Sequence, residues 1–436
     1  MITACNDPRL LVETSRMTWR QYVIIGLCVL LNGLDGFDVL SISFASPGIA
    51  ADWGVDRATL GVILSMELIG MSIGSVILGL LADRIGRRPI AIGSLFVMAG
   101  GMALAAQASG IGELAAIRFA TGLGIGGMLA CANAIVAEAA NRKARAAAVA
   151  LMASGYPLGA IIGGTIATDL LQHGTWRDIF TFGAWVTVGF LPFILLILPE
   201  SISVTVRRFD AAAALPRVNR ALNRLGHNAL SVIELVKPHE GADEGVMRGA
   251  LRRVTLLLVF AYFFHMTTFY FMLKWIPKIV TDMGFEPSAA GGVLVWANIG
   301  GFAGSLVFSV LTARAPLRPL LLATFAAAFA AVCWFGLTAS GIEPLSRSAA
   351  LAGFFTNAGA VGLYALIAAS YPSHLTAGAT GIVIGFGRGG TALGPIIAGL
   401  LFAGGAGLPV TAAVMACGSL IALAAIFFLP RQTVKT

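Results

Sequence analysis

Two aspartates inside an apolar segment are the residues with the clearest potential for chemistry. Asp35 and Asp38 lie in a hydrophobic stretch that runs from about residue 20 to residue 44. A carboxylate at the centre of a bilayer costs roughly 2.5–3.5 kcal/mol on insertion scales, so acids in such segments face protein or a water-filled cavity. Their spacing of three residues puts both on one face of a helix. The pair is therefore predicted to bind and release protons within the membrane.

Two further titratable side chains lie deep in apolar segments. Arg118 is about seven residues, or roughly 10 Å, from one face of the membrane, and Asp35 is about 22 Å from the other. In a hydrocarbon core of about 30 Å these depths are similar. Arg118 and the aspartates are therefore predicted to form a proton-coupling site, with a structural ion pair as the alternative. His265 is a second candidate for proton transfer, unless it is simply hydrogen-bonded to a neighbour.

Arg388, near the middle of the eleventh apolar segment, has no acid in its own helix. A guanidinium group binds carboxylates through two parallel hydrogen bonds, so Arg388 is predicted to hold a substrate anion, although helix packing is an alternative. Six other side chains are predicted to line a pocket for an aromatic ring, or to be ordinary core: Tyr156, Tyr270, Trp296, Asn298, Asn357 and Tyr364.

Three more residues in apolar segments are given structural roles. Glu67, in the second segment, is expected to be protonated and structural. Lys274 and Trp275, at the end of the seventh, are expected at the outer membrane interface, where such side chains anchor helices.

Composition identifies the class of protein. The chain of 436 residues is 58% hydrophobic and 11% charged, with a mean hydropathy of +0.87, whereas soluble domains are about 25% charged. Apolar segments of about 20 residues span a bilayer as helices. An all-α polytopic membrane protein is predicted, with helices near 20–44, 59–82, 89–108, 111–137, 144–169, 178–198, 251–275, 288–312, 318–339, 346–369, 376–402 and 407–429.

These segments predict a domain organisation. An N-terminal tail (1–19) precedes a six-helix bundle (20–198), a polar central loop (199–250), a second six-helix bundle (251–429) and a C-terminal tail (430–436). Of the 29 Lys and Arg residues, 22 lie on the side of the termini and the central loop. Positive residues mark the cytoplasmic side, so both termini are expected in the cytoplasm, with the protein in a bacterial inner membrane.

The formal net charge of +8 has the same explanation, so no nucleic-acid partner is expected. The basic central loop is expected to anchor the topology, and binding of anionic membrane lipids is the alternative.

The two halves of the chain resemble each other at an offset of 230 residues. Matched pairs include Ile69/Ile299, Gly70/Gly300, Gly74/Gly304, Ser75/Ser305, Leu81/Leu311, Arg84/Arg314, Arg88/Arg318 and Pro89/Pro319. Since six segments separate the copies, they have the same orientation in the membrane. Parallel six-helix halves with a site between them describe one class of secondary transporter.

The loop after the second segment, residues 79–88, closely resembles the loop signature of the major facilitator superfamily. Glu138 and Arg145 resemble the acid–arginine motif of the same superfamily, with Asn141 in place of its usual proline. The resemblance implies a fold of twelve helices in two pseudo-symmetric bundles. It also implies gating residues at the cytoplasmic end, namely Asp83, Arg84, Arg87, Arg88, Glu138 and Arg145. The second copy has Ala313 where the first has Asp83, so a gate using that carboxylate is asymmetric.

Within the superfamily, the chain resembles the aromatic acid:proton symporter family. The resemblance rests on residues 35–38 (Asp-Gly-Phe-Asp) and on residues 270–277. The glycine-rich motif around Arg388 resembles the eleventh-segment motif of sugar- and organic-acid-type members of the superfamily. The resemblance to the symporter family implies proton-coupled uptake of an aromatic carboxylate, such as a hydroxybenzoate or a phenylpropionate, by alternating access. That family often has an arginine near the position of Thr376, whereas this chain has only His374 close by, so its acid can differ.

Other functions are weighed against this one. No lysine follows a glycine, as a phosphate-binding loop requires, and the five cysteines show no metal-ligand spacing. We therefore expect no enzyme activity, cofactor or metal. A transporter of a non-aromatic acid such as muconate, or a drug/proton antiporter, is the alternative. The expected partners are an organic acid anion, protons and membrane lipids, and the protein is expected to act as a monomer.

Overall fold

The computed structural model describes residues 7–234, 247, 249–312, 314–338, 341–371 and 375–430. Within these residues the regular elements are all helices: α1 (Pro8–Thr14), α2 (Trp19–Trp53), α3 (Arg57–Ile85), α4 (Arg87–Gln107), α5 (Ile111–Ala139), α6 (Arg145–His173), α7 (Trp176–Ile197), α8 (Ile202–Arg208), α9 (Ala211–Leu225), α10 (Gly249–Asp282), α11 (Pro287–Leu311), α12 (Leu317–Leu337), α13 (Ile342–Ser370), α14 (Thr376–Gly387), α15 (Gly389–Ala403) and α16 (Leu408–Phe427).

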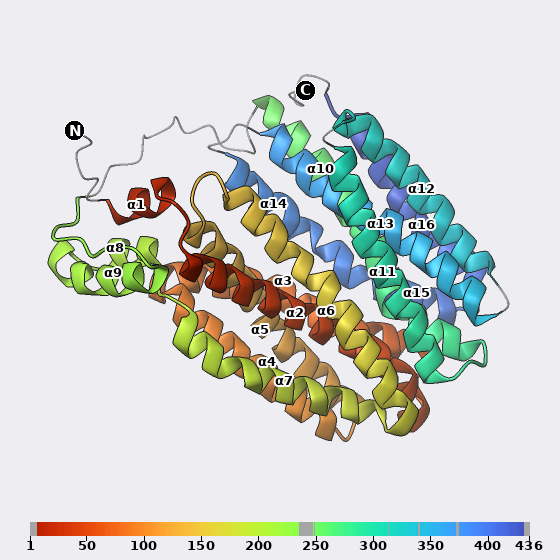
Figure 1. The fold of residues 1–436 in the computed structure, drawn as a ribbon. Helices are drawn as coiled ribbons and strands as arrows, with labels where there is room; N and C mark the ends of the chain where they lie inside the picture. Colours follow the sequence, from red (N-terminus) through yellow and green to blue (C-terminus); the bar gives the residue numbers. More distant parts are fainter. Residues whose placement is uncertain are drawn as a thin grey trace.

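The described residues contain twelve helices that are long and apolar enough to span a membrane, six in each half of the chain, and they confirm the fold predicted from the sequence. Helices α2–α7 form the N-terminal bundle and α10–α16 the C-terminal bundle (Figure 1). The eleventh span consists of α14 and α15, and Arg388 between them keeps helical torsion angles (φ −60°, ψ −19°). Two spans are longer than their apolar segments suggested, because α2 continues to Trp53 and α10 to Asp282.

Local sequence signals set the helix ends. Thr18 and Gln21 form a capping box at the start of α2, and Gly54 ends that helix in a left-handed conformation (φ 61°). Such caps satisfy backbone groups that have no partner within the helix. Asp56 caps α3 by accepting hydrogen bonds from Thr59 and from Ala58, and these bonds lower the pKa of its carboxyl group.

Glycines bring the helices within each bundle together. Gly70 and Gly74 of α3 lie against backbone atoms of α5, where a side chain would overlap carbonyl oxygens. Gly300 and Gly304 of α11 lie against α13 in the same way. In lipid, small residues allow this close approach and the van der Waals contact that comes with it. Each bundle is therefore tightly packed on its own.

The two bundles meet near one end of the molecule. We call the end that carries α1, α8 and α9 the terminal end, and the opposite end the far end. Near the far end, Gly61 of α3 lies against Gly399 of α15, and Gly291 of α11 lies beside Thr168 of α6. Helices α6 and α11 converge toward the far end and diverge toward the terminal end (Figure 1).

Toward the terminal end, one side of α14 faces open space. An added side chain at Gly378, Gly381 or Gly385 would meet no atom of the described residues within 4 Å. The most extensive contacts of α14 are with α10, α13 and α15 of its own bundle. The molecule is thus closed at the far end and open at the terminal end.

Two short helices, α8 and α9, lie in the segment that the sequence assigned to a polar central loop. They pack at the terminal end of the N-terminal bundle (Figure 1). Thr18 donates a hydrogen bond to the carbonyl of Leu225, and Arg208 donates one to the carbonyl of Ile85 at 2.8 Å. This part of the segment therefore belongs to the N-terminal bundle.

Candidate functional site

A buried cluster of charges occupies the centre of the N-terminal bundle. Arg118 on α5 donates to the Asp38 carboxylate at 3.1 Å, to the Asp38 backbone carbonyl at 2.9 Å and to the Glu67 carboxylate. All three side chains have no exposed surface. Phe180 of α7 stacks on the guanidinium group at 5.5 Å. Removing one member of such a network would leave an uncompensated charge in a dry interior.

Asp35 belongs to the same region but has no hydrogen-bond partner. Its side chain is 2% exposed, and neither carboxylate oxygen makes a hydrogen bond within the described part of the chain. The second oxygen of Asp38 is also buried without a partner there. The Gly36 backbone lies against the carbonyl of Tyr156 and so fixes α2 on α6. An unpartnered buried carboxyl is much less costly when it carries a proton.

Lys274 and Trp275 are not at the outer interface, and this expectation was wrong. Their side chains are 0% and 1% exposed. The apolar segment seemed to end at residue 275, but α10 continues for seven residues beyond that point, through Pro277 to Asp282, which is roughly 10 Å of helix. Lys274 donates to the Val39 carbonyl and lies 3.5 Å from the Glu67 carboxylate, both in the N-terminal bundle.

Arg388 lies among tyrosines that come from both bundles. The guanidinium is half-buried, and its Nη1 atom is buried without a hydrogen-bond partner among the described residues. It is close enough to Tyr262 and Tyr270 of α10 to interact with them electrostatically. The Tyr262 and Tyr364 hydroxyl groups are 3.0 Å apart. The buried hydroxyl of Tyr156 on α6 faces Tyr270. This group, Arg388 with Tyr156, Tyr262, Tyr270 and Tyr364, is called the tyrosine–arginine site below.

The remaining pocket candidates lie elsewhere. Trp296 is 52% exposed, on an apolar face of α11 that also exposes Ile299 and Leu306. Asn298 is buried and donates to the Leu294 carbonyl of its own helix at 2.9 Å. Asn357 on α13 lies against Gly301 of α11. The structure therefore does not bring these three to the tyrosine–arginine site.

His265 lies in the core of the C-terminal bundle. Its Nε2–H donates to the Thr356 carbonyl at 2.8 Å, and its Nδ1 accepts from the Ser419 hydroxyl at 3.2 Å. Its ring packs on Phe325, with centroids 4.7 Å apart. Both nitrogens are satisfied by neutral groups, and no contact described here joins His265 to the charge cluster.

The six candidate gating residues lie at the terminal end, and the structure connects three of them. Arg87 is 2.6 Å from the Glu138 carboxylate and 3.5 Å from that of Asp83. Arg145 pairs with Glu13 at 3.5 Å instead of with Glu138. Every one of these partners belongs to the N-terminal half.

The other two gating candidates, Arg84 and Arg88, make no ion pair in the described part of the chain. Arg88 donates to the Leu195 carbonyl at 2.7 Å, and Arg84 is exposed. Ala313 and His374 lie outside the described residues, and so does the side chain of Thr376.

Sequence reasoning missed three members of these sites. Glu67 was noted but assigned a neutral structural role, because no cation stands near it in the sequence. Lys274 was misplaced by the early end of its apolar segment. Tyr262 drew no attention among aromatic neighbours in α10. The spacing of eight residues between Tyr262 and Tyr270, about two helical turns, was the available signal.

In the described part of the chain, twelve helices of membrane-spanning length form two like bundles, with a buried charge cluster inside the first, which is the architecture of a polytopic membrane transporter. A family model described as Major Facilitator Superfamily matches residues 27–347 and 258–436. The chain belongs to this superfamily. It is a transporter by family and fold, and not an enzyme.

Curated relatives include transporters of aromatic acids. A 3-(3-hydroxy-phenyl)propionate transporter of Escherichia coli (strain K12) is 31% identical, with 94% of each chain covered. A gallate transporter of Pseudomonas putida is 29% identical over 89% of this chain and 87% of the relative. A 4-hydroxybenzoate transporter of Acinetobacter baylyi is 27% identical over 91% and 88%. These relatives confirm the resemblance to aromatic acid transporters.

Solved structures of the same fold include a D-xylose-proton symporter, with a TM-score of 0.74, 18% identity and coverage of 95% of this chain and 99% of that one. The xylose transporter XylE from E. coli, in an inward open conformation, has a TM-score of 0.70 with 16% identity over 95% and 98%.

Proposed function

We propose that this protein takes up an aromatic carboxylate together with protons, by alternating access between its two bundles. The tyrosine–arginine site carries the proposal. Arg388 is a half-buried guanidinium without an acid partner among the described residues. It lies near Tyr262 and Tyr270 of the C-terminal half, and Tyr270 in turn faces Tyr156 of the N-terminal half. The aromatic acid transporters among the relatives support the same substrate class.

The chemistry of the site suits a carboxylate attached to a ring. The carboxylate must lose water at mid-membrane, and two parallel hydrogen bonds from Arg388 offset that cost. Tyrosine rings stack on an aromatic ring, with edge-to-face contacts worth about 0.5–1.5 kcal/mol beyond the area they bury. The Tyr156 hydroxyl, which faces Tyr270, can hydrogen-bond a phenolic group on the substrate.

Proton coupling is assigned to the charge cluster. Asp35 and Asp38 bind the proton on the side of high concentration and release it on the other, while Arg118 holds Asp38 in place. We leave His265 out of this route, because neutral partners satisfy both its nitrogens. Neither a metal nor a cofactor has a part in this scheme.

The positive charges orient the protein. The terminal end carries most Lys and Arg residues, so we place it in the cytoplasm of a bacterial inner membrane. The arrangement described above is then open to the cytoplasm. In the opposite state we expect the loop containing Asp83 to approach α14 and close that end. The scheme needs one chain only, so we expect a functional monomer surrounded by membrane lipids.

Uptake by purified protein in liposomes tests this proposal. A panel of labelled acids would include 3-(3-hydroxyphenyl)propionate, 4-hydroxybenzoate, gallate and muconate, each with and without an inward proton gradient. We expect gradient-driven accumulation of at least one aromatic acid. Accumulation of muconate alone would move the function to non-aromatic acids. Proton-driven expulsion of a cationic dye, without uptake of any acid, would make the protein a drug antiporter instead.

A further inference from the structure

Lys274 belongs to the C-terminal bundle, but its polar partners belong to the N-terminal bundle. It is fully buried on α10. It donates to the Val39 carbonyl of α2, and its Nζ lies 3.5 Å from the Glu67 carboxylate of α3. These contacts lie across the region where the bundles touch. Any opening of the far end must therefore pull Lys274 away from both partners.

The charges around Lys274 do not balance. The titratable groups that face it or its partners are Asp35 and Asp38 on α2, Glu67 on α3, Arg118 on α5, Tyr156 on α6 and Tyr270 on α10. The tyrosines are neutral, so three carboxyl groups face two cations, and the ionised cluster carries one net negative charge. Because burying a net charge is costly, one proton is expected there, and Asp35 is the carboxyl without a hydrogen-bond partner.

Opening of the far end changes this balance by one charge. The bundles of such transporters rock largely as rigid bodies, so Lys274 leaves with the C-terminal bundle. The N-terminal bundle then holds three carboxyl groups and Arg118 alone. A second proton is needed to restore neutrality. The three carboxyl groups of the cluster share the two protons, so Asp35 and Asp38 take part in the exchange together with Glu67, which has lost Lys274.

We propose that Lys274 competes with the transported proton, and that its return to Glu67 as the far end closes expels one proton toward the terminal end. This inference rests on the proposed proton-coupled uptake. In the step, one carboxyl O–H bond breaks and water on the terminal side accepts the proton. The ammonium group keeps all its hydrogens and replaces the proton as the partner of the carboxylate. Binding outside and release inside thus follow from one movement.

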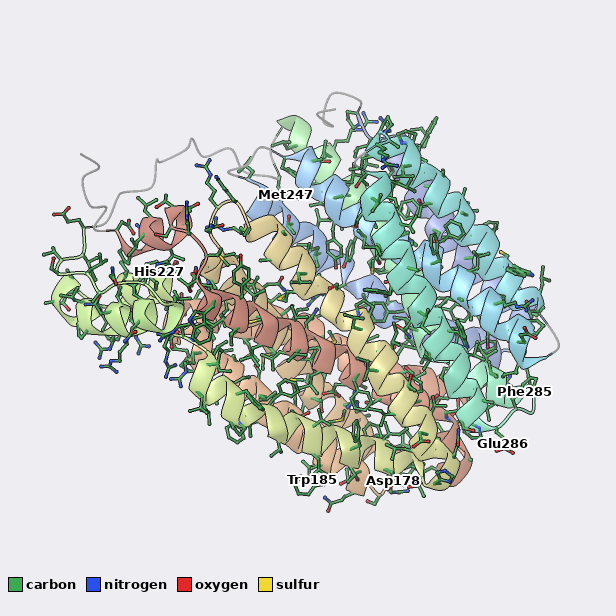
Figure 2. The ribbon with its side chains drawn as sticks, in the orientation of Figure 1. Asp178, Trp185, His227, Met247, Phe285 and Glu286 are labelled. Carbon is green, nitrogen blue, oxygen red and sulfur yellow. The ribbon has the colours of Figure 1, made fainter. Side chains whose placement is uncertain are left out.

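Linkage makes the proposal measurable without a substrate. If closing the far end releases one proton, the ratio of closed to open molecules rises by about tenfold for each pH unit at its steepest. Fluorescent labels on cysteines introduced at Ala51 and Glu286 report this ratio by energy transfer. Both residues are exposed near the far end, where Glu286 is labelled in Figure 2. The background protein has alanine in place of Cys5, Cys333 and Cys417.

Three variants separate the possible outcomes. Lys274→Met, close in length but uncharged, should reduce the pH dependence to less than about twofold for each unit. Lys274→Arg should retain it, because the charge remains. Glu67→Gln should also lose it, and serves if Lys274→Met does not fold. A wild-type slope in Lys274→Met or in Glu67→Gln, or no slope in the wild type, would overturn the proposal.

The same samples distinguish this inference from the proposed function. Labelled 3-(3-hydroxyphenyl)propionate is the probe for uptake in liposomes. Gradient-driven uptake by a wild type that shows no pH-dependent closing contradicts the role of Lys274 alone. A pH-dependent closing that Lys274→Met abolishes, without gradient-driven uptake of any acid in the panel, contradicts the proposed function and leaves the competition intact.

Discussion

The two bundles pack their helices alike but differ in the residues at their centres. At the offset of 230 residues, Gly70 and Gly74 on α3 correspond to Gly300 and Gly304 on α11, and each pair lies against the next-but-one helix of its own bundle. The close helix contacts have therefore been kept in both copies.

At the same offset, each acidic or basic residue of the N-terminal cluster corresponds to a histidine or to an uncharged residue in the C-terminal bundle. Asp35 corresponds to His265, Asp38 to Thr268, Glu67 to Ala297 and Arg118 to Ser348. His265 and Thr268 are hydrogen-bonded to neutral groups of the C-terminal bundle. One repeat unit thus supports either a buried charge cluster or a core of satisfied neutral groups. The difference shows that the fold determines where these side chains lie, whereas the residue types at those positions determine whether the site is charged.

The largest expected effect contrasts Asp35 and Asp38 with His265. Asp35→Asn and Asp38→Asn should each abolish gradient-driven accumulation, because an amide cannot take and release a proton. His265→Gln, in the position equivalent to Asp35, can still donate to Thr356 and accept from Ser419, so accumulation should stay within about twofold of wild type. Uptake of labelled acid into liposomes measures both. Retained accumulation in the two aspartate variants would remove them from the coupling step.

The second effect separates the two membrane arginines. Arg388→Lys should raise the dissociation constant of the acid by about 10- to 100-fold, since it loses the planar fork that holds a carboxylate. Arg118→Lys should leave affinity within about threefold and lower accumulation instead. Arg347→Lys, on an exposed pair with Glu343, is the control. Equilibrium binding is measured apart from transport, and a loss of affinity confined to Arg118→Lys would exchange the two roles.

The smallest effect tests the shared packing. Gly74→Ala and Gly304→Ala should destabilise the protein by similar amounts, about 1–3 kcal/mol, because both place a methyl group against a backbone carbonyl. Gly93→Ala, where the methyl group meets no atom within 4 Å, should have little effect. Thermal unfolding in detergent measures all three. Unequal losses would show that the two interfaces differ in strength.

The sequence predicted the fold because hydropathy and charge determine where helices cross a membrane. It also predicted that Arg118 would lie at the depth of the aspartates, since depth follows from counting residues along a helix. It could not predict that Arg118 would pair with Asp38 and leave Asp35 unpartnered. Helix rotation decides that, and apolar segments as uniform as α2 give little indication of their rotation.

The errors have a similar origin. Lys274 was placed at the interface because hydropathy finds the apolar part of a helix, whereas α10 extends beyond it. Trp296 and Asn298 were assigned by residue type to a pocket or to ordinary core. Their helix exposes the first, and the second is buried and hydrogen-bonded to its own backbone. Which end of the transporter is open depends on contacts between the bundles, and the sequence pattern of a single helix does not predict those contacts.

The open side of α14 has a consequence for how tolerance to mutation should be understood. In the arrangement described, Gly378, Gly381 and Gly385 touch nothing that would exclude a larger side chain. A stability measurement on this state would score all three as freely replaceable. Yet Gly61 and Gly399 show how close the bundles come at the far end, which is closed. The proposed alternating access requires α14 to come equally close to the N-terminal bundle when the terminal end closes. Selection by growth on the transported acid would then reject substitutions that do not lower the melting temperature. The glycines of α14 are therefore expected to be required in the state whose terminal end is closed.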